Sequence, residues 1–545
     1  MTKFIFVVGG VMSGIGKGIT VASTARILKD YGFKVTAVKI DPYLNVDAGT
    51  MNPIEHGEVF VTDDGLETDQ DIGNYERFAD ENIPRENYMT TGLVYQSVIN
   101  RERNLDYGGK CVQIIPHVTD EIESRLMRAA KKSKADFVLV EIGGTVGEYE
   151  NLLFLETGRI MKLKMPGHVL FILVSYFPVP KMTGEMKTKP TQHAVRSLNS
   201  AGIQPDIIIA RSEVSLDQAR KTKVSIFCNM RPQDIISAPD ISSIYEVPVN
   251  FEKDDLGQRI MEKLNLKSWE KDSRLWSAFV KKIKSSRKAV KIGIIGKYFD
   301  SGKFTLADSY ISVIEAVKHA SWSLNYQPEI VWLNAESYEK DPAKFEELKN
   351  FDGIVVPGGF GKRGVEGKIL AIKYARENNL PFLGLCYGLQ LAVIEFARHV
   401  CDLKEAHTTE VKPATPHPVI CTMADQIGKI KNKEMGGTMR LGAYPCLLTK
   451  GTKAYAAYKK ELIYERHRHR FEVNNKFRKK LNDNGMIFSG VAPDNSLVEI
   501  IELPGHPWFV AGQFHPELKS RAINPHPLFR DFVKAAKDYR ESHHD

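Results

Sequence analysis

The 545-residue chain has few cysteines and no long apolar run, although 43% of its residues are hydrophobic and 26% are charged. Without an apolar stretch long enough to cross a bilayer, we expect no membrane segment and no membrane partner. The six cysteines show no CxxC spacing, which argues against a zinc site and indicates reduced, mostly buried thiols in a cytoplasmic protein. The apolar residues 4–8 are too few for a signal peptide and continue into glycines, as a buried first strand does.

A strong excess of one charge sign is also missing, because the net charge is only +8. Such a balance suits anionic substrates as well as it suits nucleic acid. The basic stretch at residues 466–470 alternates arginine with histidine and has no interleaved aromatic residues, so we expect no nucleic-acid partner. Ion pairing near the interdomain face is the expected role of Arg466 and Arg468.

What the chain does have is two alternating α/β segments. Domains of roughly 100–250 residues predict two to four of them in a chain of this length. Short apolar runs separated by helical patterns predict a parallel sheet covered on both faces, of a P-loop-like Rossmann type in the first segment. We expect domains at residues 1–266 and 290–545. The strand-like runs are residues 4–8, 35–40, 137–142, 168–174, 206–210, 290–296, 353–356 and 381–385.

Residues 267–289 connect the two segments and carry an apolar stripe at helical spacing, made of Trp276, Phe279, Val280 and Ile283. Lysines occupy the other face, a pattern found in membrane-surface helices and in helices that bind a partner. Because a domain flanks this stretch on either side, we interpret it as a linker helix that is docked by its apolar stripe.

A glycine-rich loop at residues 9–18 follows the first predicted strand and precedes a predicted helix at 19–28. Glycines allow backbone N–H groups to converge on phosphate oxygens, and Lys17 adds a positive charge. The loop fits G-x-x-x-x-G-K, but Gly18 stands where a Ser or Thr usually binds magnesium. The position of the loop after the first strand favours a nucleotide site.

Carboxylates must therefore hold the metal that accompanies a nucleotide at this loop. Asp71 belongs to an acidic cluster at residues 67–71, and Glu141 ends a predicted strand. Acidic groups at strand ends beside a phosphate loop suit Mg²⁺ bound to ATP, so these two are the predicted ligands. For Asp69, a solvated surface charge is an equally good interpretation.

A second chemical site is indicated by residues 384–388, where Cys386 lies between glycines, after an apolar strand and before a helix. This pattern is a nucleophile elbow with cysteine in place of serine. The N-terminus of the following helix favours the thiolate form of a cysteine. His515 and Glu517, far downstream, supply a base and a carboxylate that orients it, which completes a triad for acyl transfer.

Residues 187–193 and Lys223 form a further group of cations and hydroxyls. Such a group suits a second polyphosphate. Judged from composition alone, solvated loop lysines are the preferred interpretation.

Taken in order, these motifs resemble the CTP synthase family over nearly the whole chain. The resemblance implies a synthetase domain fused to a class I glutamine amidotransferase domain. It further implies that ATP phosphorylates O4 of UTP and that ammonia from L-glutamine displaces the phosphate, giving CTP for pyrimidine biosynthesis. The resembling stretches are residues 9–20, 39–47, 55–61, 74–78, 141–147, 187–193, 357–361, 384–388, 466–470 and 513–517.

The resemblance also implies roles for individual residues. Cys386 attacks the glutamine amide, His515 acts as base and then as acid, and Glu517 orients His515. The implied magnesium ligands are Asp71 and Glu141, and the ATP-binding residues are Ser13, Gly14, Ile15, Gly16, Lys17, Gly18 and Asp71. The implied UTP/CTP-binding residues are Ser13, Glu148, Tyr149, Glu150, Lys187, Thr188, Lys189, Pro190, Thr191, Gln192 and Lys223. The implied glutamine-binding residues are Gly359, Tyr387, Gly388, Leu389, Gln390, Glu410 and Arg470.

One residue departs from the family pattern, because Tyr387 follows the nucleophile where the family usually has leucine. Only the backbone N–H of this residue is needed, together with one near Gly359, to form an oxyanion hole, so we expect activity to survive. The family is typically tetrameric, activated by GTP and inhibited by CTP, and a tunnel for ammonia is expected. Filament formation alongside catalysis and another ATP-dependent amidotransferase reaction remain the alternatives.

Overall fold

The structure is a computed structural model that describes residues 1–52, 56–182, 184–267, 270–296, 300–301, 304–305, 307–432 and 436–543. By their contacts, the residues form two compact units. Unit 1 comprises Met1–Ala48 and Asp71–Val280, and unit 2 comprises Gly49–Gln70 and Lys281–Asp545. The segment Gly49–Gln70, which falls within the first domain expected from the sequence, therefore packs with unit 2.

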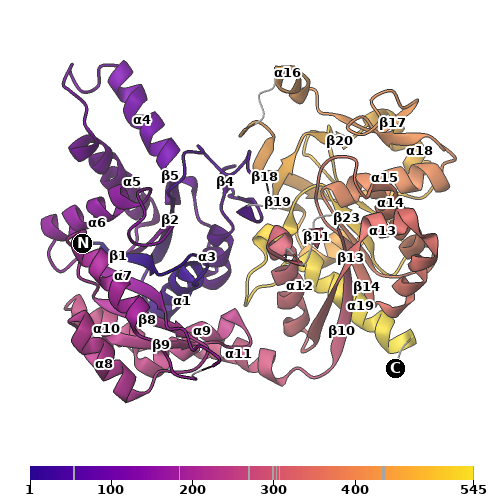
Figure 1. The fold of residues 1–545 in the computed structure, drawn as a ribbon. Helices are drawn as coiled ribbons and strands as arrows, with labels where there is room; N and C mark the ends of the chain where they lie inside the picture. The colour runs from indigo at the N-terminus through magenta and orange to yellow at the C-terminus, as the bar shows by residue number, and fades with distance from the viewer. Residues whose placement is uncertain are drawn as a thin grey trace. The chain divides into compact units, whose positions relative to one another are not determined.

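Unit 1 is built on a parallel sheet with the strand order β5-β2-β6-β1-β7-β8-β9 among the described residues (Figure 1). Its central strands are apolar along nearly their whole length because helices cover both faces. The strands are β1 (Lys3–Gly10), β2 (Val35–Asp41), β5 (Tyr88–Thr90), β6 (Phe137–Ile142), β7 (Val169–Tyr176), β8 (Ile207–Ser212) and β9 (Ile235–Pro239).

Helices cover the two faces of this sheet. They are α1 (Lys17–Asp30), α3 (Asp71–Ala79), α4 (Thr91–Arg103), α5 (Thr119–Ser133), α6 (Leu152–Lys164), α7 (Lys189–Ser200), α8 (Gln218–Cys228), α9 (Val247–Phe251) and α10 (Leu256–Lys263). Helices α1, α3, α9 and α10 pack together, and the apolar core on the other face draws on α4 to α8. In a parallel sheet of this kind, ligands bind beyond the carboxyl ends of the strands. The loop after β1 and Glu141 near the end of β6 lie at that edge.

Unit 2 contains a mixed sheet with the strand order β13-β10-β14-β15-β23-β22-β21-β18-β19 in the described part of the chain. The first five of these strands run parallel, and the others pair antiparallel. They are β10 (Ala289–Gly296), β13 (Gln327–Asn334), β14 (Gly353–Val356), β15 (Phe382–Leu385), β18 (Arg440–Leu448), β19 (Leu462–His469), β21 (Ile487–Val491), β22 (Val498–Glu502) and β23 (Phe509–Gly512).

Smaller sheets and helices complete unit 2. The short strands are β3 (Phe60–Val61), β4 (Glu67–Thr68), β11 (Asp300–Ser301), β12 (Phe304–Thr305), β16 (Ala406–Thr408), β17 (His417–Thr422) and β20 (Phe471–Val473). The helices are α12 (Ile311–Ser323), α13 (Ala335–Lys340), α14 (Val365–Glu377), α15 (Tyr387–His399), α16 (Gln426–Lys431), α17 (Lys453–Tyr458), α18 (Asn475–Asp483) and α19 (Pro527–His543).

Strand adjacency explains how distant sequence motifs meet in unit 2. β15 lies between β14 and β23, and all three run parallel. Their carboxyl ends therefore lie side by side, and the chain leaves them into residues 357–361, 386 and 513–517. The sheet thus brings together three segments that span about 160 residues of sequence.

The predicted strands are present in the structure, and within the predicted linker at residues 267–289 a helix spans 274–285, whereas residues 268–269 lie outside the described part of the chain. Helix α11 (Arg274–Ser285) buries Trp276, Phe279, Val280 and Ile283 to 7% exposure or less. Trp276 packs against Tyr245, and its indole N–H donates to the Tyr245 carbonyl at 2.9 Å. The stripe is therefore part of the core. Among the described residues, no helix is long and apolar enough to cross a bilayer.

Candidate active sites

Cys386 occupies a sharp turn between β15 and α15. Its backbone has φ +50°, which is unusual for a residue with a side chain, and its N–H donates to the Gly512 carbonyl at 2.7 Å. The neighbouring glycines are required by close packing, because a Cβ on Gly388 would lie 2.2 Å from the Val356 carbonyl oxygen. A Cβ on Gly384 would similarly meet Ala511 at 2.7 Å. The turn is the nucleophile elbow predicted from the sequence.

His515 and Glu517 follow β23 and form the pair predicted for the triad. Nδ1 of His515 is 2.7 Å from Oε1 of Glu517. Burial alone would lower the pKa of His515, but the negative charges of Glu517 and Cys386 outweigh burial and raise this pKa to about 10. Within the described residues, Nε2 of His515 has no hydrogen-bond partner. The ring is thus fixed through one nitrogen, and the other is available for proton transfer.

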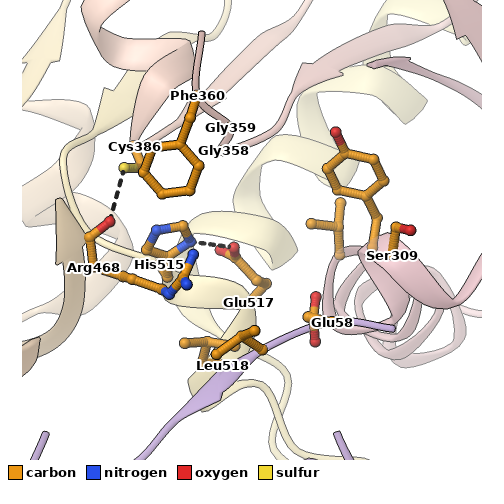
Figure 2. Close-up of a pocket in the computed structure, with 13 residues that line it drawn as sticks. Glu58, Ser309, Gly358, Gly359, Phe360, Cys386, Arg468, His515, Glu517 and Leu518 are labelled. Atoms are coloured by element: carbon orange, nitrogen blue, oxygen red, sulfur yellow. Dashed lines mark hydrogen bonds and ion pairs between the residues drawn. The ribbon is translucent and has the colours of Figure 1, made fainter. Parts of the chain in front are cut away.

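A cavity of about 90 Å³ opens onto this pair. Its lining includes Cys386, His515, Glu517, Gly359 and Arg468. Figure 2 shows the His515 imidazole between Cys386 and Glu517. The Cys386 thiol lies 3.8 Å from the Arg468 carbonyl oxygen in this arrangement. The thiol, the base and the carboxylate therefore come together at one cavity, which is what acyl transfer requires.

The candidate oxyanion hole lies where residues 357–361 meet the turn at Cys386. Gly359 lines the cavity, and Tyr387 is the first residue of α15, where backbone N–H groups point away from the body of the helix. The loop with Gly359 is fixed at Gly361, whose N–H donates to Oε1 of Glu410 at 2.7 Å. Glu410, predicted to bind glutamine, thus also contacts the backbone of the oxyanion loop.

The other residues predicted to bind glutamine surround the elbow. Gln390 is buried and donates to the Phe471 carbonyl at 2.9 Å, and Arg470 donates to Thr438 at 2.8 Å. Leu389 is fully buried in the apolar core, and Gly388 lacks a side chain, so only their backbone is available to a ligand. Arg470 is the cation of this set that could bind a carboxylate.

In unit 1, the phosphate loop has the backbone that the glycines predicted. Gly14 and Gly16 adopt φ +71° and +89°, and Gly16 caps α1. Ser13 is exposed in the loop, whereas Ile15 is buried beneath it. Lys17 begins α1, and its Nζ donates to the Gly144 carbonyl at 2.8 Å. Burial lowers the pKa of Lys17.

Gly18 is explained by its contact with Asp71. A Cβ at residue 18 would lie 2.0 Å from Oδ1 of Asp71, so any side chain here would collide with the carboxylate. Asp71 thus occupies the space beside the loop where a hydroxyl-bearing residue would place its side chain. That carboxylates hold the metal in place of the missing Ser or Thr stays a prediction.

Asp71 and Glu141 are linked through Lys39, a residue that the sequence analysis did not select for the site. Lys39 Nζ contacts Oδ2 of Asp71 and lies 3.0 Å from Oε1 of Glu141. Burial and then the charge of Asp71 raise the pKa of Glu141 to about 7. Two carboxylates that share one ammonium are close enough to share one cation, and oxygen ligands are those that Mg²⁺ prefers. A lysine within the otherwise largely apolar strand β2, two residues before its end, was the signal that could have identified Lys39.

A second cavity, of about 230 Å³, borders the phosphate loop and was not predicted. It is lined by Gly14 and Gly16, by Arg211 near the end of β8, and by Asp240 and other residues at and after the end of β9. Arg211 is held by Asp240 at 2.8 Å. The position of Arg211 and Asp240 at the carboxyl ends of adjacent strands was the available signal.

The cations predicted to bind UTP or CTP phosphates gather near the N-terminus of α7. Thr188 precedes this helix, Lys189 begins it, and Pro190 occupies its first turn, where helices favour anions. Lys187 pairs with Glu185 at 2.6 Å, and the charge of Lys223 also lowers the pKa of Glu185. Lys187 and Lys223 therefore both act on the charge of Glu185.

Other residues of this set are held differently. Thr191 is fully buried and hydrogen-bonds Ser175 at 2.8 Å, and Gln192 donates to Thr188 at 3.1 Å. Glu148 accepts from the Thr145 hydroxyl at 2.6 Å. Tyr149 is 89% exposed, and Glu150 is also exposed.

Comparison with known proteins assigns each part of the chain to a family. The sequence model described as CTP synthase N-terminus matches residues 3–266, and the one described as glutamine amidotransferase class-I matches residues 305–535. Among solved structures, the glutaminase domain of Trypanosoma brucei CTPS with bound acivicin is 35% identical. It covers 46% of this chain and 94% of its own, with a TM-score of 0.43.

Curated relatives match the whole chain. A CTP synthase of Carboxydothermus hydrogenoformans is 53% identical over 537 residues, which are 98% of this chain and 99% of the relative. A CTP synthase of Geobacillus kaustophilus is 52% identical with the same coverage. Identity of this extent over both units shows that the chain belongs to the CTP synthase family.

Proposed function

We propose that this chain catalyses the ATP-dependent amination of UTP to CTP with ammonia released from L-glutamine. The proposal rests on the presence of two sites in one chain of the CTP synthase family. One is a thiol–imidazole–carboxylate group, and the other is a phosphate loop with two adjacent carboxylates. The first group performs acyl transfer, and the second binds a nucleotide. Together they provide a nitrogen donor and an activating phosphate.

In the glutaminase reaction, the Cys386 thiolate attacks the amide carbon of glutamine. His515 gives a proton to the leaving nitrogen, so that ammonia departs and a thioester remains. His515 then takes a proton from the water that hydrolyses this thioester to glutamate. The N–H groups of Gly359 and Tyr387 stabilise the negative oxygen in both steps.

In the synthetase reaction, unit 1 holds ATP and UTP through the residues described above. Lys17 and the loop N–H groups bind the ATP phosphates, and the cavity beside Arg211 and Asp240 accepts the rest of that nucleotide. Asp71 and Glu141 would hold Mg²⁺, which neutralises phosphate charge when it is bound. Phosphorylation of O4 turns a poor leaving group into a good one, and ammonia then displaces phosphate.

The proposal includes further properties that the family resemblance implies. Lys187, Lys189 and Lys223 bind UTP phosphates, and CTP acts as an inhibitor at an overlapping site. GTP is the activator, and the active form is a homotetramer that is able to form filaments. Ammonia passes from Cys386 to UTP through an enclosed path, because free ammonia would be protonated and diluted in solvent.

Product analysis tests the reaction. The purified chain is incubated with UTP, ATP, Mg²⁺ and glutamine, and nucleotides are separated by chromatography. We expect CTP, ADP, phosphate and glutamate in equal amounts. Consumption of ATP and glutamine without CTP would indicate a different acceptor, and absence of both half-reactions would overturn the assignment.

An isotope experiment tests the enclosed path. Unlabelled glutamine is supplied together with ¹⁵N-ammonium at equal concentration, and the 4-amino nitrogen of CTP is analysed by mass spectrometry. We expect mostly unlabelled CTP. A label content that matches the bulk ammonium would show that ammonia equilibrates with solvent before it reacts.

A further inference from the structure

We infer that the Tyr387 side chain is a positioning residue for the oxyanion loop of the glutaminase site. This inference rests on the proposed glutaminase reaction and extends it to a side chain that the reaction does not use directly. Its hydroxyl donates to the Gly361 carbonyl oxygen at 3.0 Å. Tyr387 thus offers its backbone N–H to the oxyanion and its side chain to the loop that carries the other donor.

The ring of Tyr387 is fixed by its surroundings. The residue is 2% exposed and packs in the apolar core of unit 2. The ammonium of Lys368, which is itself buried, lies 5.7 Å from the ring centroid, within the range of a cation–π interaction. A buried ring with few accessible rotamers holds its hydroxyl in one place, so the bond to Gly361 restrains the loop.

Gly361 is restrained from two sides. Glu410 accepts its N–H at 2.7 Å, and Tyr387 donates to its carbonyl. Gly361 has φ +77°, so the chain turns at this residue and the bonds fix the direction in which the turn is made. Tyr387 is the first residue of α15 and Glu410 follows β16, so the two restraints come from different elements.

The restrained loop tolerates little movement near the reacting groups. A Cβ on Gly358 would lie 2.8 Å from Cε1 of His515 and 3.7 Å from Cβ of Cys386, so no side chain fits between the loop and these two residues. Oxyanion donors act only when they point at the place where charge develops, and small displacements cost large factors in rate. Loss of the Tyr387 hydroxyl should therefore lower the rate of the chemical step more than it changes glutamine binding.

Tyr387→Phe tests the inference, because it removes the hydroxyl and keeps the ring. Tyr326→Phe is the matched control. Tyr326 is also buried, lies just before β13 at the other end of the sheet, and donates its hydroxyl to Glu541. For each protein we measure kcat and KM for glutamine hydrolysis, the rate of Cys386 alkylation by iodoacetamide, and the melting temperature. Tyr387→Leu is measured in addition, so that poor folding of one variant does not decide the result.

We expect kcat of Tyr387→Phe to fall about 5- to 50-fold while KM changes less than about threefold. Alkylation, which forms no oxyanion, should keep its wild-type rate, and Tyr326→Phe should keep its kcat. Wild-type kcat in both Tyr387 variants, or equal losses of kcat in Tyr387→Phe and the control, would overturn the inference. Absence of glutamine hydrolysis in the wild-type protein would instead overturn the proposed function.

Discussion

At the scale of single residues, the charge of Glu517 controls the protonation of His515. The pKa of His515 is raised to about 10 because the charges of Glu517 and Cys386 outweigh burial. A raised pKa in the folded state means that the protonated ring adds stability below pH 6.5, and that this stability is lost as the pH rises toward 10. Glu517→Gln should therefore lower the free energy of unfolding of unit 2 by about 1–3 kcal/mol at pH 6 and by much less at pH 10.

Urea unfolding of the full chain at the two pH values checks this prediction. The same variant should lose about 10²- to 10⁴-fold in kcat for glutamine hydrolysis, since the ring loses its orienting partner. A stability difference that is the same at pH 6 and pH 10 would show that Glu517 does not act through the charge of His515.

Individual residues also show where sequence reasoning reaches its limit. Gly18 was recognised as a departure from the phosphate-loop pattern, and its contact with Asp71 gives the reason. Lys39 was missed because a lysine inside an apolar strand does not reveal which carboxylates it will meet. Tyr387 was interpreted through its backbone alone, since the acceptor of its hydroxyl, Gly361, is 26 residues away in sequence.

At the scale of elements, the segment Gly49–Gln70 is attached to strand β19 by ion pairs. Arg466 is fully buried, pairs with Asp63, and lies 5.2 Å over the Phe60 ring, and Arg468 pairs with Glu67 at 2.8 Å. The sequence predicted ion pairing for these two arginines, and the structure confirms it. The partners could not be predicted, because about 400 residues of sequence separate each pair.

Asp63→Asn tests the contribution of this attachment. The change leaves a buried guanidinium without its carboxylate and should lower the free energy of unfolding of unit 2 by about 1–2 kcal/mol, a moderate value because Asp63 is itself partly exposed. Asp483→Asn, which breaks the exposed pair with Lys479, is the control and should leave stability unchanged. Equal urea midpoints for all three proteins would contradict the prediction.

The carboxyl ends of parallel strands were the most informative elements in the sequence. Residues 9–18, Glu141 and Cys386 were selected on this ground, and the structure has them at or near the carboxyl ends of β1, β6 and β15, while their roles stay predictions. The antiparallel strands from β18 to β22 were not predicted, since their pairing depends on partners that are distant in sequence.

At the scale of the whole molecule, two reactions in one chain predict two classes of variant. Cys386→Ala should abolish CTP formation from glutamine, while formation from added ammonium salt continues. Lys17→Ala should abolish CTP formation from either nitrogen source, since both need ATP. Steady-state rates with glutamine and with ammonium chloride measure this difference.

Two outcomes would contradict the assignment of the two reactions to separate sites. Loss of ammonia-dependent synthesis in Cys386→Ala would show that the thiol is needed beyond the release of ammonia. Normal ammonia-dependent synthesis in Lys17→Ala would show that the phosphate loop is assigned to the wrong nucleotide or to none.

The course of the chain through unit 2 has a practical consequence for anyone who isolates that unit. A fragment that starts at Lys281 would lack Asp63 and Glu67 and would expose two arginines that the whole protein keeps paired. Such a fragment should be poorly soluble or less stable, and a synthetic peptide of residues 49–70 should rescue it in trans. Unit 2 is thus discontinuous in sequence, and a fragment cut at the linker helix loses residues 49–70.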